Sequence, residues 1–414
     1  MNQNPDKAQK DWPSVIVAGG YHTGVQLMRN LAGHGVTVSI VDANEAQPCF
    51  KSRYGKSHLC PNPDERPGEW LKFMASLAAQ APIKPVLIAS ADVFVLAIAR
   101  HASELAKSFT FCESTMELQV LLATKERQYE IAPVHGMPVS RTQMIHSIEE
   151  VSAFAATAVF PCILKPIHFR EWQRLPRDHP LYYKKLVVAA SIQELEESYR
   201  LAAGLTPEMV LQEVIEGPDT SKVVYLSCYS RTGERIGNCM VREIRTAPIY
   251  YGSASVVEPV EDPEADRICD EFLRSLGYVG LCEIELKRDS RDGRVKMIEA
   301  NPRYSVTADA APYAGVHLGW LHYLDMIGQP VTPVHGNGQD FRHIFLFLDA
   351  GTIVNYWRAG LLTLGGLLRS YRPPIHFFDL DWQDWRIALT TLRQSLRALA
   401  GQIARIVIPR GPAR

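Results

Sequence analysis

Apolar runs of strand length alternate with amphipathic segments in the first 115 residues. Residues 15–18 are apolar, residues 36–41 read as a second strand, and the two enclose a glycine-containing turn and a helical pattern. Residues 85–89 form a third apolar run, and a helix is predicted after it over residues 93–106. Strands that alternate with helices predict a parallel α/β domain over residues 1–115.

The pattern of residues 116–330 is mixed. Helices are predicted over residues 117–135, 191–201, 262–276 and, after a loop, up to residue 327. Ser191 with Glu194 three residues later is an N-terminal capping pattern, and Gly277 is a helix stop. Strands are predicted at 160–165, 209–213 and 222–229, so this part is α+β.

A charged hairpin over residues 280–303 is the most informative stretch. Residues 282–287 alternate, which places Glu283 and Glu285 on one strand face. The Asp292–Gly293 pair predicts a tight turn, and residues 295–298 form the return strand. An antiparallel pairing therefore brings Glu285 beside Glu299.

This hairpin offers hard oxygen ligands. Glu285, Glu299 and Asn301 would supply two carboxylates and an amide oxygen, a set suited to Mg²⁺ bound to phosphate. Arg303 adds a forked cation for a phosphoryl or carboxylate group. A surface hairpin whose charges are only solvated is the alternative.

Composition narrows the function classes. The net charge of −1 gives no support for a general nucleic-acid or membrane-surface binder. The eight cysteines include no CxxC pair, which suits reduced thiols in a cytoplasmic protein. The first residues lack the apolar core of a signal peptide, and no apolar run reaches the length of a membrane span.

The N-terminal turn carries glycines at 19, 20 and 24, and the second strand ends in Asp42. This spacing departs from the dinucleotide pattern, so tight packing of strand against helix is the better interpretation. Asp92 follows the strand at 85–89, where it could contact a substrate or cap the next helix.

Five motifs follow one another in an order that resembles the ATP-grasp superfamily, most closely its D-aspartate-ligase branch of carboxylate–amine ligases. The resemblance covers about 200 residues. It implies a Rossmann-like N-terminal domain, a two-lobed ATP-grasp domain over 116–330 and a C-terminal extension over 331–414. The small lobe would span about residues 145–213 and the large lobe about 214–330. The motifs are a helix with Lys125, the loop Gly136-Met137-Pro138, the strand end Lys165-Pro166, the hinge sequence from Gln212 to Gly217, and Glu285 with Glu299-Ala300-Asn301-Pro302-Arg303.

The resemblance assigns roles residue by residue. ATP and Mg²⁺, with Mn²⁺ as an alternative ion, are the implied cofactors. Arg303 and Lys165 would be catalytic, and Glu285, Glu299 and Asn301 would hold the metal. Arg242, Arg245 and Asp92 are weaker substrate candidates. ATP would be bound by Lys125, Lys165, Glu213, Val214, Ile215 and Asp219, with Glu216 as the alternative ribose ligand.

One segment departs from the superfamily pattern. The residues after Lys165 contain no glycine-rich phosphate loop, and Arg170, Arg174, Lys184 or Lys185 would have to supply charge in its place.

The implied reaction joins a small, amino-acid-like carboxylate to an amine through an acyl phosphate. Three alternatives stay open: a bicarbonate-activating enzyme of the carboxylase or carbamoyl-phosphate-synthase kind, a non-catalytic ATP-binding protein, and, last, a dehydrogenase.

Residues 331–414 are the least informative. A strand is predicted at 341–348 and a basic amphipathic helix at 386–407. Docking of this helix on the main body is expected, and a homodimer contact or a peripheral membrane contact are the alternatives.

Overall fold

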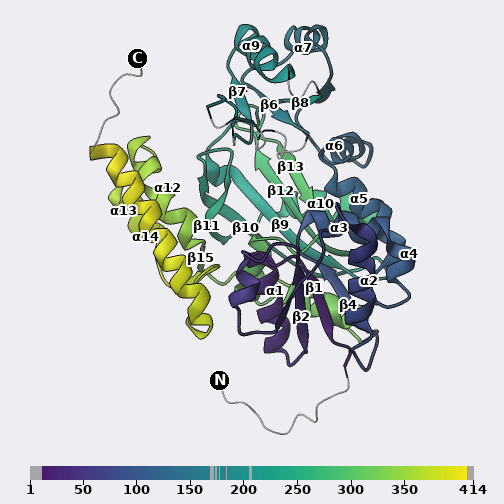
Figure 1. The fold of residues 1–414 in the computed structure, drawn as a ribbon. Helices are drawn as coiled ribbons and strands as arrows, with labels where there is room; N and C mark the ends of the chain where they lie inside the picture. Colours follow the sequence, from purple (N-terminus) through teal and green to yellow (C-terminus); the bar gives the residue numbers. More distant parts are fainter. Residues whose placement is uncertain are drawn as a thin grey trace.

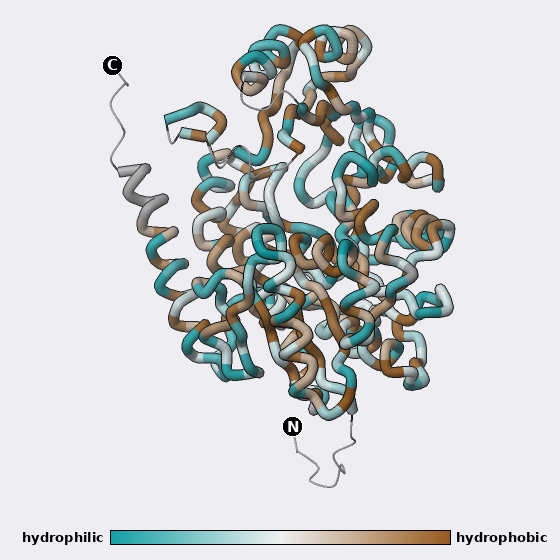
Figure 2. The backbone as a smooth tube through the Cα atoms, turned by 45° about the vertical axis from the view of Figure 1, so that its right-hand side comes forward, coloured by the Kyte–Doolittle hydropathy of each residue, from teal (hydrophilic) through white to brown (hydrophobic). Residues whose placement is uncertain are grey.

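The computed structural model describes residues 12–167, 172, 175–176, 178–182, 184–204 and 208–407. Three sheets organise these residues, and a set of C-terminal helices stands beside the largest sheet (Figure 1). The most hydrophobic stretches run along the central strands, and hydrophilic stretches lie at turns and outer helices (Figure 2). The fold is therefore built around buried sheets, as the sequence predicts for a mixed α/β chain.

The N-terminal sheet is four-stranded and parallel, in the order β3-β2-β1-β4. Strands β1 and β4 are continuous apolar runs because their side chains are buried on both faces of the sheet. The helix predicted at 93–106 is divided at His101 into α3 and α4. The elements are β1 (Val15–Ala18), α1 (His22–Gly33), β2 (Val38–Asp42), β3 (Lys56–Leu59), α2 (Pro67–Ala78), β4 (Val86–Ala89), α3 (Asp92–Arg100) and α4 (Ala102–Leu105).

Packing accounts for the glycines of the first turn. The Gly20 N–H donates to the Asp42 carboxylate over 2.6 Å, and a Cβ on Gly24 would lie 1.9 Å from the Gly19 carbonyl oxygen. Asp42 thus closes the turn itself, as expected for tight packing of strand against helix.

The small lobe is an antiparallel sheet in the order β5-β8-β6-β7, with its own apolar core. Ser191 caps α9 by accepting the Glu194 N–H, as predicted. Two helices lead from the N-terminal domain into this lobe, because the helix predicted at 117–135 breaks at Thr124. The elements are α5 (Met116–Ala123), α6 (Lys125–Val134), β5 (Thr142–Ile145), α7 (Ile148–Ala155), β6 (Cys162–Pro166), β7 (Val187–Ala189), α9 (Ile192–Ala203) and β8 (Met209–Glu213).

The large lobe is built on an eight-stranded sheet in the order β13-β12-β9-β10-β11-β15-β16, with β14 beside β10. Gly277 ends α10 with a positive φ of 63°, as the sequence predicts. The single helix expected up to residue 327 is instead two pieces separated at Gly315. The elements are β9 (Lys222–Tyr229), β10 (Arg235–Ala247), β11 (Ser253–Pro259), α10 (Pro263–Ser275), β12 (Gly280–Arg288), β13 (Val295–Asn301), η4 (Thr307–Ala314) and α11 (Leu318–Met326).

The C-terminal residues differ from the prediction in two respects. They add β14 (Val334–His335), β15 (Arg342–Ile344) and β16 (Ile375–Phe377) to the large-lobe sheet, so the predicted boundary at 330 does not separate two sheets. The strand predicted at 341–348 was too long, because helix α12 (Leu346–Arg358) begins within it. Helices α13 (Leu364–Ser370) and α14 (Trp385–Val407) follow, and α14 lies along α12.

Candidate active site

The predicted hairpin forms, and its two acids meet. Strands β12 and β13 pair antiparallel with Glu285 directly opposite Glu299. The register of the two strands shifts between Glu285 and Leu286, and Glu285 and Glu299 remain paired on the near side of this shift. Both carboxylates line a cleft of about 310 Å³ between the two lobes, together with Lys125 and Lys165. We call this space the lysine–glutamate cleft.

The two lysines reach the cleft from different lobes. Lys125 is the first residue of α6, and its Nζ lies 3.5 Å from the Glu299 carboxylate. Lys165 lies on small-lobe strand β6, and its Nζ donates to Gln212 Oε1 over 3.1 Å and to the Tyr129 hydroxyl over 3.3 Å. The Nζ atom also lies 4.9 Å from the centre of the Tyr129 ring. Both lobes thus contribute a cation to the cleft that holds the paired acids, and Lys185, Lys222 and Lys287 line it as well.

The charges in the cleft are unevenly balanced. Burial raises the pKa of Glu299, but Lys125, Lys165 and Arg303 outweigh it and lower the pKa to about 2. Burial, followed by the charge of Glu299, raises the pKa of Glu285 well above its usual value. Glu299 is held ionised by the lysines, whereas the charge of Lys222 does not outweigh the effects that raise the pKa of Glu285.

Burial, followed by the charge of Lys125, lowers the pKa of Lys165 to about 7. Glu299 is the first cause of the raised pKa of Lys125. An anion placed between the lysines would favour the charged form of Lys165, so the cleft is prepared for a polyanionic ligand.

The donor set fits a divalent ion that also binds phosphate. Glu285 and Glu299 are adjacent, and a cation between them would favour the ionised form of Glu285. Within the described part of the chain, no group of three or more His, Cys, Asp or Glu side chains is arranged to hold a metal alone. Mg²⁺ commonly takes one or two carboxylates and completes its shell with phosphate and water.

Asn301 and Arg303 lie at the end of β13 and contact each other. The Asn301 Oδ1 accepts from Arg303 over 3.1 Å, and its amide nitrogen donates to Glu283 over 3.0 Å. Arg303 also donates twice to Asp92, over 2.5 and 3.2 Å, so two predicted site residues from different domains meet. In this arrangement the Asn301 oxygen faces Arg303, not a metal position.

The hinge residues border the cleft, but some of their polar groups already form hydrogen bonds within the protein. The Val214 N–H donates to Pro161 over 3.0 Å, and its carbonyl accepts from Arg291 over 2.7 Å. The Glu213 carboxylate accepts the Val159 N–H over 2.9 Å. Glu213, Val214 and Ile215 all line the lysine–glutamate cleft, as the sequence predicts.

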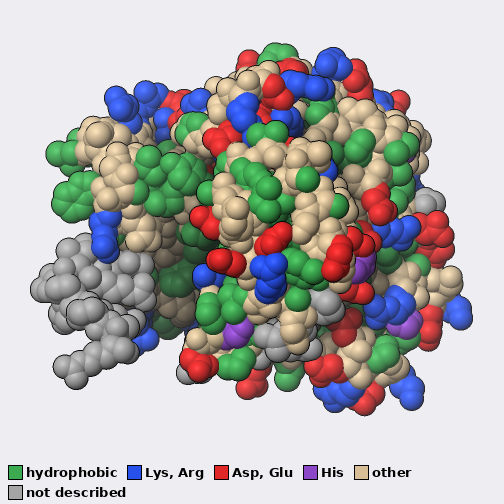
Figure 3. Space-filling model, turned by 90° about the horizontal axis from the view of Figure 1, so that it is seen from above, with side chains coloured by type: hydrophobic (Ala, Val, Ile, Leu, Met, Phe, Trp, Pro, Cys, Tyr) green, Lys and Arg blue, Asp and Glu red, His purple; other side chains and the backbone are tan. Residues whose placement is uncertain are grey.

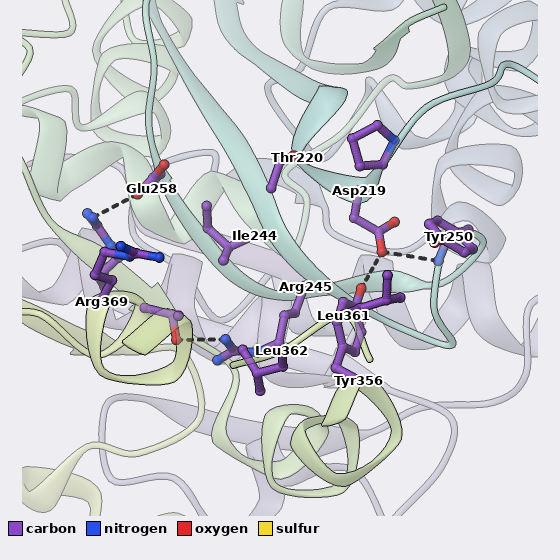
Figure 4. A pocket seen from close by; sticks show the side chains of 14 residues that line it. Asp219, Thr220, Ile244, Arg245, Tyr250, Glu258, Tyr356, Leu361, Leu362 and Arg369 are labelled. Carbon is purple, nitrogen blue, oxygen red and sulfur yellow. Dashed lines mark hydrogen bonds and ion pairs between the residues drawn. The ribbon is translucent and has the colours of Figure 1, made fainter. Parts of the chain in front are cut away.

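Asp219 lies outside this cleft. It is buried, accepts from the Tyr356 hydroxyl and from the Tyr250 N–H over 3.2 Å, and lies 3.7 Å from Lys222 Nζ. The structure therefore gives it a tethering role between the large lobe and α12, in place of the predicted ribose contact. Figure 4 shows this arrangement in a second cavity of about 440 Å³.

Arg242 and Arg245 also differ from their predicted substrate role. The two arginines are three residues apart on β10, a spacing that puts them on opposite faces of a regular strand, and the register also shifts between Glu243 and Arg245. Arg242 binds Glu258 at the surface. Arg245 is 1% exposed and makes two bonds to Asp349, over 2.9 and 2.8 Å.

Comparison with known proteins agrees with this architecture. The chain is 25% identical over 249 residues to the D-aspartate ligase of Enterococcus faecium, a match that spans 57% of each chain, or just over half of that relative. The N5-carboxyaminoimidazole synthetase from Staphylococcus aureus, complexed with ADP, covers 78% of this chain and 79% of its own at a TM-score of 0.59 and 15% identity. The chain has the ATP-grasp fold.

A second solved structure supports the same conclusion. The biotin carboxylase domain of Hydrogenobacter thermophilus 2-oxoglutarate carboxylase, with MgADP, ADP and bicarbonate, covers 77% of this chain and 70% of its own at a TM-score of 0.58 and 16% identity. No protein-family model matches the chain.

Several residues of this ATP-grasp cleft were missed by sequence reasoning. Glu283 is buried and accepts from Asn301 and from Ser305 over 2.6 Å, so it fixes the end of the hairpin. Its signal was present, because the strand alternation places it on the face of Glu285. Tyr129 and Gln212 both bind Lys165. Gln212 opens the hinge motif but was assigned no role, and Tyr129 carries no motif that a single sequence reveals.

The segment after Lys165 is partly described. Arg170 and Arg174 lie outside the described residues. Lys185 lines the cleft, where its Nζ lies 3.5 Å from the Ser253 hydroxyl, and Lys184 is exposed. Lys185 is therefore the described candidate for the charge that would replace a glycine-rich loop.

No helix in the described ranges combines the length and apolar character that crossing a membrane requires.

Proposed function

We propose that the protein is an ATP-dependent carboxylate–amine ligase. The observation that carries the proposal is the convergence of Lys125 and Lys165 with the Glu285–Glu299 pair in one cleft between two lobes. The similarity to a D-aspartate ligase supports an amino-acid-like carboxylate or amine as substrate.

ATP would lie with its phosphates between the lysines and the paired glutamates, and with its base against the hinge at residues 213–215. Mg²⁺ held by Glu285 and Glu299 would neutralise phosphate charge. Lys125 and Lys165 would orient the phosphoryl groups. Asn301 completes the proposed metal set only if its side chain turns away from Arg303.

The reaction needs positioning and charge compensation, and no protein nucleophile. A carboxylate oxygen of the substrate attacks the γ-phosphorus, the bond to the bridging oxygen breaks, and ADP leaves. The amine nitrogen then attacks the acyl carbon, the bond between that carbon and the phosphate oxygen breaks, and inorganic phosphate departs as the amine loses a proton. Arg303 lies beside the cleft acids and would stabilise the oxyanion of this second step.

ADP release measured against a panel of amino acids and small organic acids, with and without an amine, tests the proposal. Release that requires both a carboxylate and an amine is expected. ATP binding without turnover for every acid–amine pair would instead identify a non-catalytic nucleotide-binding protein.

A bicarbonate-dependent reaction is the second candidate, because a structural neighbour was solved with MgADP and bicarbonate. The same assay separates the two. ADP release that depends on bicarbonate and not on an organic acid would replace the ligase proposal.

A further inference from the structure

The C-terminal helices expose a cluster of large apolar side chains that we call the apolar crest. It consists of Trp357, Leu361, Leu364 and Leu368, which are 69%, 47%, 74% and 67% exposed. Leu364 and Leu368 are one turn apart on α13 and share a face. Figure 3 shows hydrophobic side chains gathered at this edge of the molecule, with Lys or Arg side chains beside them. Contiguous apolar surface of this kind marks an interaction site.

The charged residues of the segment that carries the crest, residues 351–372, are all arginines. Arg358, Arg369 and Arg372 flank it and are exposed. Arg372 binds Asp340, whereas Arg358 and Arg369 form no ion pair with any described residue. Residues 351–372 contain no Asp or Glu.

Helix α14 repeats this chemistry. Its side facing away from α12 exposes Leu389 and Leu396, which are 40% and 66% exposed, together with Arg393 and Arg397. Residues 351–372 and 385–414 together hold nine arginines, while all 45 acidic residues of the chain lie elsewhere. The basic amphipathic helix packs along α12, and these apolar and basic side chains stay exposed.

The charge pattern indicates which partner would bind the apolar crest. A second copy of this chain would meet it through a two-fold contact, in which the same patch faces itself. That contact would place arginines against arginines, with no acid in these segments to pair them. An acidic lipid surface supplies the missing negative charge and accepts the Trp and Leu side chains together.

We propose that the outer face of the C-terminal extension binds the surface of an anionic lipid bilayer. The crest residues enter the interfacial layer, and Arg358 and Arg369 contact lipid phosphate. The extension is held to the body by the buried Arg245–Asp349 pair, so the lipid-bound face is rigidly connected to the lysine–glutamate cleft.

Co-sedimentation of the full chain with phospholipid vesicles tests the proposal. Vesicles of neutral phosphatidylcholine are compared with vesicles in which about a third of the lipid is anionic phosphatidylglycerol. Each arginine near an anionic surface contributes about a fivefold factor in binding, so the two cations should give more than tenfold tighter binding to the anionic vesicles. Raising the salt from about 0.1 M to 1 M shortens the screening length from about 10 to 3 Å and should remove most of that difference.

Two variants and a matched control locate the contact. Leu364→Glu with Leu368→Glu should reduce partition into anionic vesicles at least tenfold, and Arg358→Glu with Arg369→Glu should abolish the preference for anionic lipid. Leu201→Glu, an exposed leucine of α9 on the distant small lobe, should bind like the parent chain. All substituted side chains are exposed, and unchanged melting temperatures confirm that each variant folds.

Three results would overturn the proposal. One is the absence of binding to anionic vesicles, and another is equal binding to both kinds of vesicle. The third is a concentration-dependent dimer in sedimentation velocity that the leucine variant abolishes while vesicle binding is unaffected, which would assign the crest to a second copy.

Discussion

The titration of Lys165 gives a quantitative prediction for nucleotide binding. Burial, followed by the charge of Lys125, lowers the pKa of Lys165 to about 7, whereas a triphosphate favours the ammonium form. Above pH 7 the free protein has lost this proton and must take it up again when the nucleotide binds. The affinity for ATP is therefore expected to fall as the pH rises through 7.

The size of the effect follows from the fraction of protonated Lys165. Nearly all of the free protein carries the ammonium at about pH 6, and about one tenth carries it at about pH 8. The affinity should fall about tenfold between these values, which is about 1.4 kcal/mol. The same shift affects folding: the unfolded chain binds the proton more tightly than the folded one, so this group makes stability rise with pH between about 7 and 10.5.

Isothermal titration calorimetry over this pH range, in buffers of different ionisation enthalpy, measures both the affinity and the proton uptake. The matched control is Lys165→Arg, because a guanidinium stays charged at these pH values. Subtracting the control removes the titration of ATP itself. Parallel affinity profiles for the parent chain and Lys165→Arg, with equal proton uptake, would refute the assignment of Lys165 to the phosphates.

Two further predictions concern packing. Asp349→Ala leaves the guanidinium of Arg245 buried and unpaired, so it should lower the free energy of unfolding by about 3–5 kcal/mol in urea denaturation. Asp349→Asn should lower the free energy of unfolding by less. An unchanged denaturation midpoint would contradict a structural role for the pair. Gly24→Ala should destabilise the N-terminal domain by about 1–3 kcal/mol, because the new Cβ meets the Gly19 carbonyl oxygen at 1.9 Å. Calorimetric melting checks the second prediction, and a nicotinamide dinucleotide that bound and stabilised the parent chain would show that the turn serves a ligand instead.

Local periodicity predicted the elements that carry the cleft. The alternation around Glu285 and the Asp–Gly turn determine the pairing with Glu299, because strand register and turn geometry are local properties of the sequence. The strands at 209–213 and 222–229 have the predicted bounds for the same reason.

Contacts between distant segments account for what the sequence did not predict. Asp219 follows the hinge at the position expected of a ribose ligand. The hydroxyl of Tyr356, 137 residues away, instead donates a hydrogen bond to its carboxylate. Arg245 is bound by Asp349, 104 residues away. The apolar run at 341–348 becomes a short strand and a helix, because a run of this length fits both elements and packing decides between them.

Carboxylate-dependent ADP release by Glu299→Gln and Glu285→Gln tests the central claim most directly. Each change keeps the shape of the side chain and removes one of the paired charges, so both variants should keep the parental melting profile and lose at least about 100-fold in ADP release, about 2.7 kcal/mol in the barrier. Release at the parental rate by either folded variant would show that the glutamate pair does not carry the reaction.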